Sequence, residues 1–235
     1  LYWMFLALIW GRYSGQTDQR LDKDVYLAIN SSQPVSDLIN EIEDQRGRIE
    51  IKPADLEGRG AGHPLHRMLY VIAKFNKATD WANGGSLQDT MGDYNSIQSH
   101  HIFPQAFLYR NGYESENHLD KQKVNEIANR AFITRDTNFD ISDENPSEYL
   151  KKVGGKYPEA LKQQMIPTDQ SMWEVGKYND FLMARRKMIA DSINLFLETL
   201  KGKEAEEVVN YAETIKNGEN DYVEFKSSLR WDYEQ

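Results

Sequence analysis

The chain contains 235 residues, of which 40% are hydrophobic and 11% aromatic, so it can fold around a core as one large or two small domains. It contains no cysteine, which excludes disulfides and thiolate metal sites, and any metal must be held by His, Asn, Asp, Glu or backbone oxygens. The formal net charge of −9 does not favour nucleic-acid binding over the whole surface, because phosphate contacts normally come from clustered Lys and Arg.

The first ten residues form the most apolar run of the chain. A bilayer span takes about 20 apolar residues, and this run also lacks a basic start and a small-residue cleavage site. We therefore expect neither a membrane helix nor a signal peptide. The run predicts a core helix of a longer protein that lies in the cytoplasm and has no membrane partner.

The next segments alternate between helical and irregular patterns. Apolar residues recur at helical spacing in 21–29 and in 38–42, and both segments are predicted to be amphipathic core helices. Residues 49–51 alternate like a short strand. The glycine-rich stretch 58–62 predicts a flexible loop and, because no Gly-Lys-Ser or Gly-Lys-Thr follows, not a phosphate-binding loop. A further helix is predicted over 63–75.

The centre of the chain carries a pair of adjacent histidines. Residues 78–95 are rich in turn formers and lead into a strand that contains His100 and His101. On an ideal strand these side chains point to opposite faces, so they can serve one centre only where the strand breaks. Pro104 provides that break. The polar segment 105–124 is predicted to be a loop with a helical turn that can carry specificity.

A second β-prone run, 129–134, begins at Asn129, and Asn138 follows it. Phosphodiester hydrolysis needs a base that deprotonates water, a cation that takes up charge, and rigid placement of both. His101 is the candidate general base, because an unperturbed His pKa of ~6.5 allows it to accept a proton at neutral pH. Asn138 can supply a neutral oxygen ligand. Asn129, whose amide both donates and accepts, can orient the loop that carries His101.

Three pieces of sequence carry a family resemblance: His100-His101-Ile102-Phe103-Pro104-Gln105, Asn129-Arg130-Ala131-Phe132-Ile133-Thr134, and Asn138 with the segment 141–150. Together they resemble the HNH (His-Me finger) nuclease domain of GmrSD-type restriction proteins, and their order is also similar to that in the HNH domain of CRISPR RNA-guided nucleases. The resemblance implies a ββα-metal unit closed by a helix over 147–153. It also implies a DNA substrate, a divalent metal ion and a role in defence against foreign or modified DNA.

The residue before the general base departs from the family pattern. In those families this position usually holds an acidic metal ligand, whereas this chain has His100. The resemblance thus implies His100 and Asn138 as metal ligands, with Mg²⁺ or Mn²⁺ bound, or Ni²⁺ or Zn²⁺, which imidazole favours. Adjacent histidines and asparagines also occur at ordinary turns. A catalytically silent nucleic-acid-binding or interaction module is therefore the alternative.

Basic residues flank the expected site although the chain as a whole is acidic. Arg130 and Arg135 are candidate phosphate contacts, and ordinary solvated surface is the alternative. Three lysines follow in the sequence: Lys151, Lys152 and Lys156. The remaining histidines are more typical of helix caps and surface positions than of metal ligands: His63, His66 and His118.

Beyond residue 156 the pattern is helical, with apolar stripes over 181–200 and 208–215 that predict packing. Residues 223–229 resemble the opening strand of a Schlafen AlbA-like domain, and a mobile acidic tail is the alternative. The N-terminal segments resemble the helical region that follows the ParB-like NTP-binding domain in GmrSD-type proteins. An NTP-binding N-terminal domain is therefore expected in the full-length protein.

The sequence thus predicts a mainly α-helical, α+β protein in which an HNH ββα-metal unit is embedded between helical segments. We expect a helical region over 1–95, the nuclease unit over 96–153, C-terminal helices over 154–217, and a linker or a further domain over 218–235. The expected activity is that of a metal-dependent DNA endonuclease.

Overall fold

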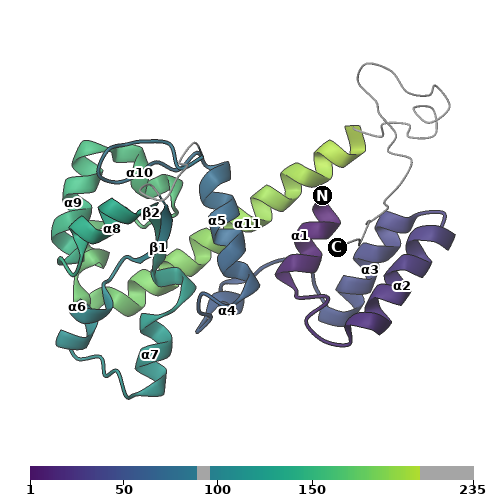
Figure 1. Ribbon diagram of the computed structural model, residues 1–235, viewed down its shortest axis with the longest axis horizontal. Helices are drawn as coiled ribbons and strands as arrows, with labels where there is room; N and C mark the ends of the chain where they lie inside the picture. The colour runs from purple at the N-terminus through teal and green to yellow at the C-terminus, as the bar shows by residue number, and fades with distance from the viewer. Residues whose placement is uncertain (89–95, 207–235) are drawn as a thin grey trace, which may run out of the picture.

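The computed structural model describes residues 1–88 and 96–206, with side chains described as far as Lys201. The predicted segments 208–215 and 223–229, and the end of 78–95, lie outside the described residues. The described part is mainly helical with a two-stranded antiparallel sheet, which confirms the α+β prediction (Figure 1). Its strands are β1 (Ile97–His101) and β2 (Arg130–Thr134). Its helices are α1 (Tyr2–Ile9), α2 (Thr17–Asn30), α3 (Pro34–Arg46), α4 (Pro53–Leu56), α5 (Pro64–Phe75), α6 (Gln105–Arg110), α7 (His118–Val124), α8 (Arg135–Ile141), α9 (Pro146–Lys156), α10 (Pro158–Gln163) and α11 (Tyr178–Glu206), with 3₁₀ turns at Ile127–Asn129, Gln170–Trp173 and Val175–Lys177.

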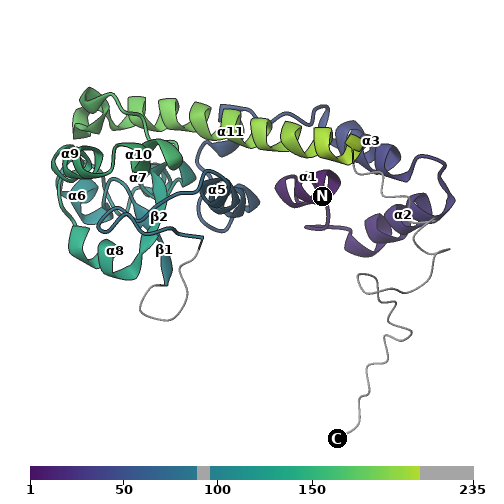
Figure 2. The same cartoon turned by 90° about the horizontal axis from the view of Figure 1, so that it is seen from above.

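Helix α11 links the two ends of the molecule. It runs from the group formed by the sheet and α6–α10 to the group formed by α1–α3, and Figure 2 shows it lying along one side of both. Its predicted apolar stripe is buried, as Phe181, Ile189 and Ile193 are all fully covered. Such burial along one helix face is the main source of helix stability in a folded chain.

Helix α1 is a core helix, as the sequence predicts. Tyr2, Leu6 and Ile9 are buried, and the helix packs against α3, α5 and α11. No helix within the described residues is both long enough and apolar enough to cross a bilayer.

The prediction that α2 packs through its apolar stripe is wrong. The helix forms, but Leu21, Val25 and Ile29 are 47%, 48% and 74% exposed. The buried residue of α2 is Asp24, which accepts a hydrogen bond from Arg12 Nε at 2.6 Å. A buried, paired carboxylate therefore fixes which face of the helix turns inward, and the apolar stripe lies on the other side.

Two further segments differ from their predictions. Residues 49–51 form no strand. The backbone groups of Ile51 bind the side chain of Asn194 in α11 instead of a neighbouring strand. Ile51 N donates to Asn194 Oδ1 at 2.9 Å, and Asn194 Nδ2 donates to Ile51 O at 2.8 Å. The segment 105–124 contains two short helices, α6 and α7, rather than a loop with one helical turn. Asn117 supports α7 as its N-cap by accepting from Leu119 N at 2.9 Å.

Helix α8, which was not predicted from the sequence, lies between β2 and the segment 147–153 that was expected to close the ββα unit. Strand β2 ends at Thr134, and α8 begins at the next residue. Asp80, which is 1% exposed, holds this junction by accepting from Thr134 N at 2.8 Å and from Thr137 Oγ1 at 2.6 Å. The expected helix over 147–153 exists as part of α9. Asn138 lies within α8.

Candidate functional site

A cavity of about 360 Å³ opens where β1 ends. Its lining includes both histidines of the pair, Asn138 from α8, and Gln105 from the first turn of α6. In the sheet register His101 pairs with Arg130, and His100 pairs with Ala131, so the two imidazoles leave opposite faces of β1. They can both reach the cavity because the strand ends at His101.

His100 is the buried member of the pair, with 3% of its surface exposed. Its Nδ1 lies 2.7 Å from Asn138 Oδ1, and its Nε2 lies 3.4 Å from Tyr149 Oη. Tyr149 in turn donates its hydroxyl proton to Ile102 O at 2.5 Å. Burial lowers the pKa of His100 to about 4, so at neutral pH the ring is neutral and carries a single N–H.

This single proton cannot serve both contacts of His100. In the Nε2–H tautomer the ring donates to Tyr149 Oη, whose own proton is used on Ile102 O, and the Nδ1 lone pair faces the oxygen of Asn138 at 2.7 Å. A cation bound to both atoms satisfies that arrangement, and a ring N–H held by an outer partner is the usual setting of a metal-binding imidazole. In the Nδ1–H tautomer the ring instead donates to Asn138 Oδ1 at 2.7 Å, and no cation is required.

The orientation of two amides provides a metal-free alternative. Asn138 Nδ2 donates to Gln98 Oε1 at 3.3 Å. Exchanging O and N in both the Asn138 and the Gln98 amides would satisfy the same contacts without a cation. Metal titration separates the cation-binding arrangement from the metal-free ones, since it alone presents a pair of lone pairs to a cation.

His101 is half-buried and lies beside a shared amide oxygen. Its Nε2 lies 3.3 Å from Asn125 Oδ1, which also accepts from Gln105 Nε2 at 2.7 Å and from Arg130 Nη2 at 3.3 Å. Burial, reinforced by the positive charge of Arg130, lowers the pKa of His101 to about 4. The ring is therefore neutral at pH 7 and able to accept a proton.

Arg130 is half-buried and has only neutral partners within the described residues. Its guanidinium donates to Ser99 O at 3.3 Å and to the Asn125 amide, and it forms no ion pair with any described carboxylate. Burial lowers the pKa of Arg130. Arg135, the other predicted phosphate contact, is exposed at the first position of α8 and does not line the cavity.

Asn129 lies outside the cavity wall, fully buried behind it. Its side chain is hydrogen-bonded to backbone groups of Phe103 and Val124, and its own carbonyl accepts from Ile102 N at 2.9 Å. The residue thus fixes the turn after His101 and does not approach the space between His100 and Asn138.

The other residues singled out in the sequence lie elsewhere. His63 caps α5, where its Nδ1 accepts from Leu65 N at 3.2 Å, and His66 contacts Ser99 Oγ at 2.8 Å. His118 is exposed at the start of α7. The three flanking lysines are exposed on α9 and do not line the cavity: Lys151, Lys152 and Lys156.

No group of three or more His, Asp or Glu side chains is placed to hold a metal within residues 1–88 and 96–201. The donors that meet at the cavity are an imidazole nitrogen and an amide oxygen, so water and substrate oxygens would complete the shell. Asp143 also lines the cavity, but its carboxylate is paired with Arg110 Nη1 at 2.6 Å, and this pairing lowers the pKa of Asp143.

The chain is 24% identical over 215 residues to an uncharacterized protein of Methanocaldococcus jannaschii. The match covers 83% of this chain and 34% of that protein, so the chain spans about a third of the length of this relative. No family model matches the chain, and no solved structure matches it.

Sequence reasoning did not assign a role to three groups around the histidines. Gln105 at the start of α6 donates to Asn125 at the end of α7. These residues are 20 positions apart, so no short sequence motif contains both. Tyr149 reaches His100 from α9, 49 positions away. Their shared signal is that each is a polar residue near an expected turn or helix end, which is too common to single them out.

Proposed function

We propose that this chain is a metal-dependent HNH-type endonuclease that hydrolyses DNA phosphodiester bonds, with the nuclease unit over 96–153. The observation that carries the proposal is the meeting of His100, His101 and Asn138 at one cavity, at the end of a strand–strand–helix arrangement. The order β1, β2, α8 has the strand–strand–helix form of a ββα-metal unit, with α8 in place of the helix over 147–153 that the resemblance implies and with Asn129 behind the turn.

In this proposal His101 is the general base. It is neutral at pH 7 and can take a proton from the attacking water. A pKa of about 4 describes a weak base in the free protein. A bound phosphate diester would raise the pKa of His101, because its negative charge stabilises the imidazolium and offsets the charge of Arg130.

His100 Nδ1 and Asn138 Oδ1 are the groups that would hold a divalent cation. When bound, such a cation neutralises charge on the phosphate and on the departing 3′ oxygen. The imidazole of His100 favours Mn²⁺, Ni²⁺ or Zn²⁺ more than a carboxylate at this position would, although Mg²⁺ remains a candidate.

Arg130 would contact a phosphate oxygen of the substrate. A half-buried guanidinium whose partners among the described residues are all neutral gains most from an anionic ligand, and Arg recognises phosphate through paired N–H donors. Arg135 can contribute only as an exposed charge near the backbone of the duplex. The sequence resemblance further supports a role in cytoplasmic defence, together with an NTP-binding domain in the full-length protein.

One observation favours the second candidate, a catalytically silent nucleic-acid-binding or interaction module. His100 stands where the related families usually carry an acid, and no third ionisable ligand joins it within the described residues. A cation held by only two protein donors would bind weakly.

Metal-dependent nicking of supercoiled plasmid tests the proposal. The purified chain, stripped with chelator, is assayed with Mg²⁺, Mn²⁺, Ni²⁺ or Zn²⁺. We expect nicking that chelator abolishes and that His101→Ala reduces by at least ~10²-fold, the usual scale for a general base, with no loss of folding. His118→Ala, which removes an exposed histidine, is the matched control.

Two outcomes decide against the proposal. Undiminished nicking by folded His101→Ala would remove this residue from the mechanism. Absence of nicking with every metal, while the chain still binds DNA, would favour the silent module.

A further inference from the structure

The amide of Asn125 has a fixed orientation because two of its partners admit only one role. Its Nδ2 donates to Lys121 O at 2.9 Å, and a carbonyl can only accept. Arg130 Nη2, which can only donate, lies 3.3 Å from Asn125 Oδ1. These contacts identify which end of the amide is the oxygen, and that oxygen lies toward His101.

The orientation of Asn125 determines which nitrogen of His101 carries the proton. His101 Nε2 lies 3.3 Å from Asn125 Oδ1, and because the oxygen can only accept, Nε2 must be the N–H. We infer that Asn125 is a positioning residue that holds His101 in the Nε2–H tautomer and leaves Nδ1 as the proton acceptor. The inference rests on the proposed nuclease function for its consequence in cleavage, but not for the tautomer itself.

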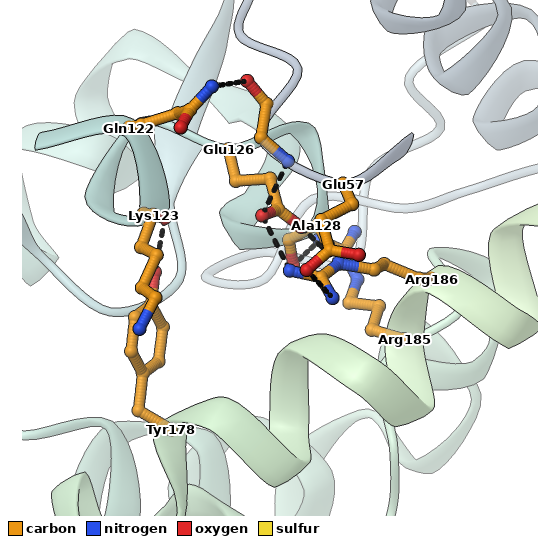
Figure 3. A network of polar contacts seen from close by, with 9 residues as sticks. Glu57, Gln122, Lys123, Glu126, Ala128, Tyr178, Arg185 and Arg186 are labelled. Carbon is orange, nitrogen blue, oxygen red and sulfur yellow. Dashed lines mark hydrogen bonds and ion pairs between the residues drawn. The ribbon is translucent and has the colours of Figure 1, made fainter. Parts of the chain in front are cut away.

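The segment that carries Asn125 is held in place from its buried side. Glu126, the next residue, is fully buried and accepts from Arg186 of α11 at 2.6 and 2.7 Å (Figure 3). The same carboxylate accepts from Gly58 N at 3.0 Å. A buried carboxylate with an ion-pair partner and a backbone donor is fixed in position, because breaking the pair would leave a buried charge alone.

Helix α11 also holds the backbone on both sides of Asn125. Tyr178 Oη donates to Lys123 O at 2.9 Å, and Arg185 Nη1 donates to Ala128 O at 2.8 Å (Figure 3). The backbone position of Asn125 therefore depends on these contacts of its neighbours as well as on the contacts of its own side chain. Its side chain can be changed while the backbone that presents it stays anchored.

Asn111 provides a matched control. Asn125 is the C-cap of α7 and bonds Lys121 O, four residues earlier, whereas Asn111 is the C-cap of α6 and bonds Phe107 O, also four residues earlier, at 2.8 Å. Asn111 is exposed and does not contact either histidine of the pair. Replacing it removes the same helix-end contact without touching His101.

The tautomer is measured by long-range ¹H–¹⁵N correlation spectra of the metal-free chain labelled in its histidine rings. The His101 signals are identified by their loss in His101→Gln. We expect the Nε2–H form in the unaltered chain and in Asn125→Asp, which keeps an acceptor oxygen. Asn125→Ala should give a mixture of both forms, and Asn111→Ala should leave the spectrum of His101 unchanged.

Cleavage and metal binding supply the second readout. We expect Asn125→Ala to lower the rate of plasmid nicking by about 10- to 100-fold, the scale found when a partner that orients a functional histidine is lost. Its affinity for Mn²⁺ alone, measured by calorimetry, should change less than twofold, because His100 and Asn138 are untouched. Asn125→Asp should retain more activity than Asn125→Ala.

A His101 Nδ1–H form in the unaltered chain would overturn the inference, even if Asn125→Ala did not fold. A folded Asn125→Ala chain with an unchanged tautomer would overturn it as well. If the unaltered chain nicks no plasmid, the proposed function fails, while the tautomer spectra still decide the role of Asn125.

Discussion

Asn129 binds both backbone groups of Phe103 with one side chain. Its Oδ1 accepts from Phe103 N at 2.8 Å, and its Nδ2 donates to Phe103 O at 3.0 Å. The Asn129 amide thus supplies the two hydrogen bonds that a neighbouring strand would supply, just after β1 has ended. Its Nδ2 also donates to Val124 O at 2.9 Å, so the turn after His101 is joined to the end of α7.

Asn129→Ala should therefore destabilise the chain as well as impair cleavage. Three buried backbone groups would lose their partner, at a cost of ~1–3 kcal/mol each if water does not replace it. Thermal melting without metal should show a clear fall in Tm. Asn111→Ala, which removes an exposed asparagine, is the control and should change Tm little. An unchanged Tm for Asn129→Ala would mean that the turn does not depend on this amide.

Asn138→Ala should have the opposite profile. Asn138 is half-buried within α8, where alanine is a better helix former, so Tm of the metal-free chain should change little. Its Oδ1 faces His100 Nδ1, and the affinity for Mn²⁺ should fall by at least about tenfold. Calorimetric titration measures the affinity. Full Mn²⁺ affinity in the variant would exclude Asn138 as a ligand.

His100→Asp should shift the metal preference toward Mg²⁺. A carboxylate is a harder ligand than imidazole, and the change restores the residue type that the related families usually carry. Activity profiles with Mg²⁺, Mn²⁺ and Ni²⁺ test this, with His101→Asp as a control that should lose activity with every metal. Identical profiles for the unaltered chain and His100→Asp would indicate that His100 does not bind the metal. A melting curve is needed alongside, because the new carboxylate is placed in a buried position.

The fold class and the strand end were accessible from the sequence because each depends on local pattern. Pro104 predicts the end of β1, and the helical spacing of apolar residues over 181–200 predicts α11. Which face of α2 is buried could not be predicted from the sequence, because it depends on the hydrogen bond between Arg12 and Asp24, 12 positions apart. Likewise, no local pattern reveals that Asn194 would replace a strand partner for Ile51. The candidate site follows the same rule: the histidines are visible in sequence, whereas Asn125 becomes visible only through its distant contacts.

Lowering the pH should destabilise the metal-free chain at pH values well above those at which carboxylates titrate. Burial lowers the pKa of His100 and of His101 to about 4 in the folded chain, against ~6.5 when unfolded. Between these values the unfolded chain binds more protons, so the free energy of unfolding rises with pH there and is lost as pH falls. Each histidine can contribute at most roughly 3 kcal/mol to this loss. His63 and His66 shift in the same direction and add to it.

Urea unfolding of the chelator-treated chain between pH 7.5 and pH 4.5 measures this loss. We expect the free energy of unfolding to be constant above about pH 7 and to fall steadily below about pH 6.5. His101→Gln should reduce the slope, because glutamine does not titrate. Saturating Mn²⁺ should make the fall steeper, since protonation of His100 would then also release the bound metal. A free energy of unfolding that stays constant down to pH 4.5 would show that these imidazoles are not held neutral by burial.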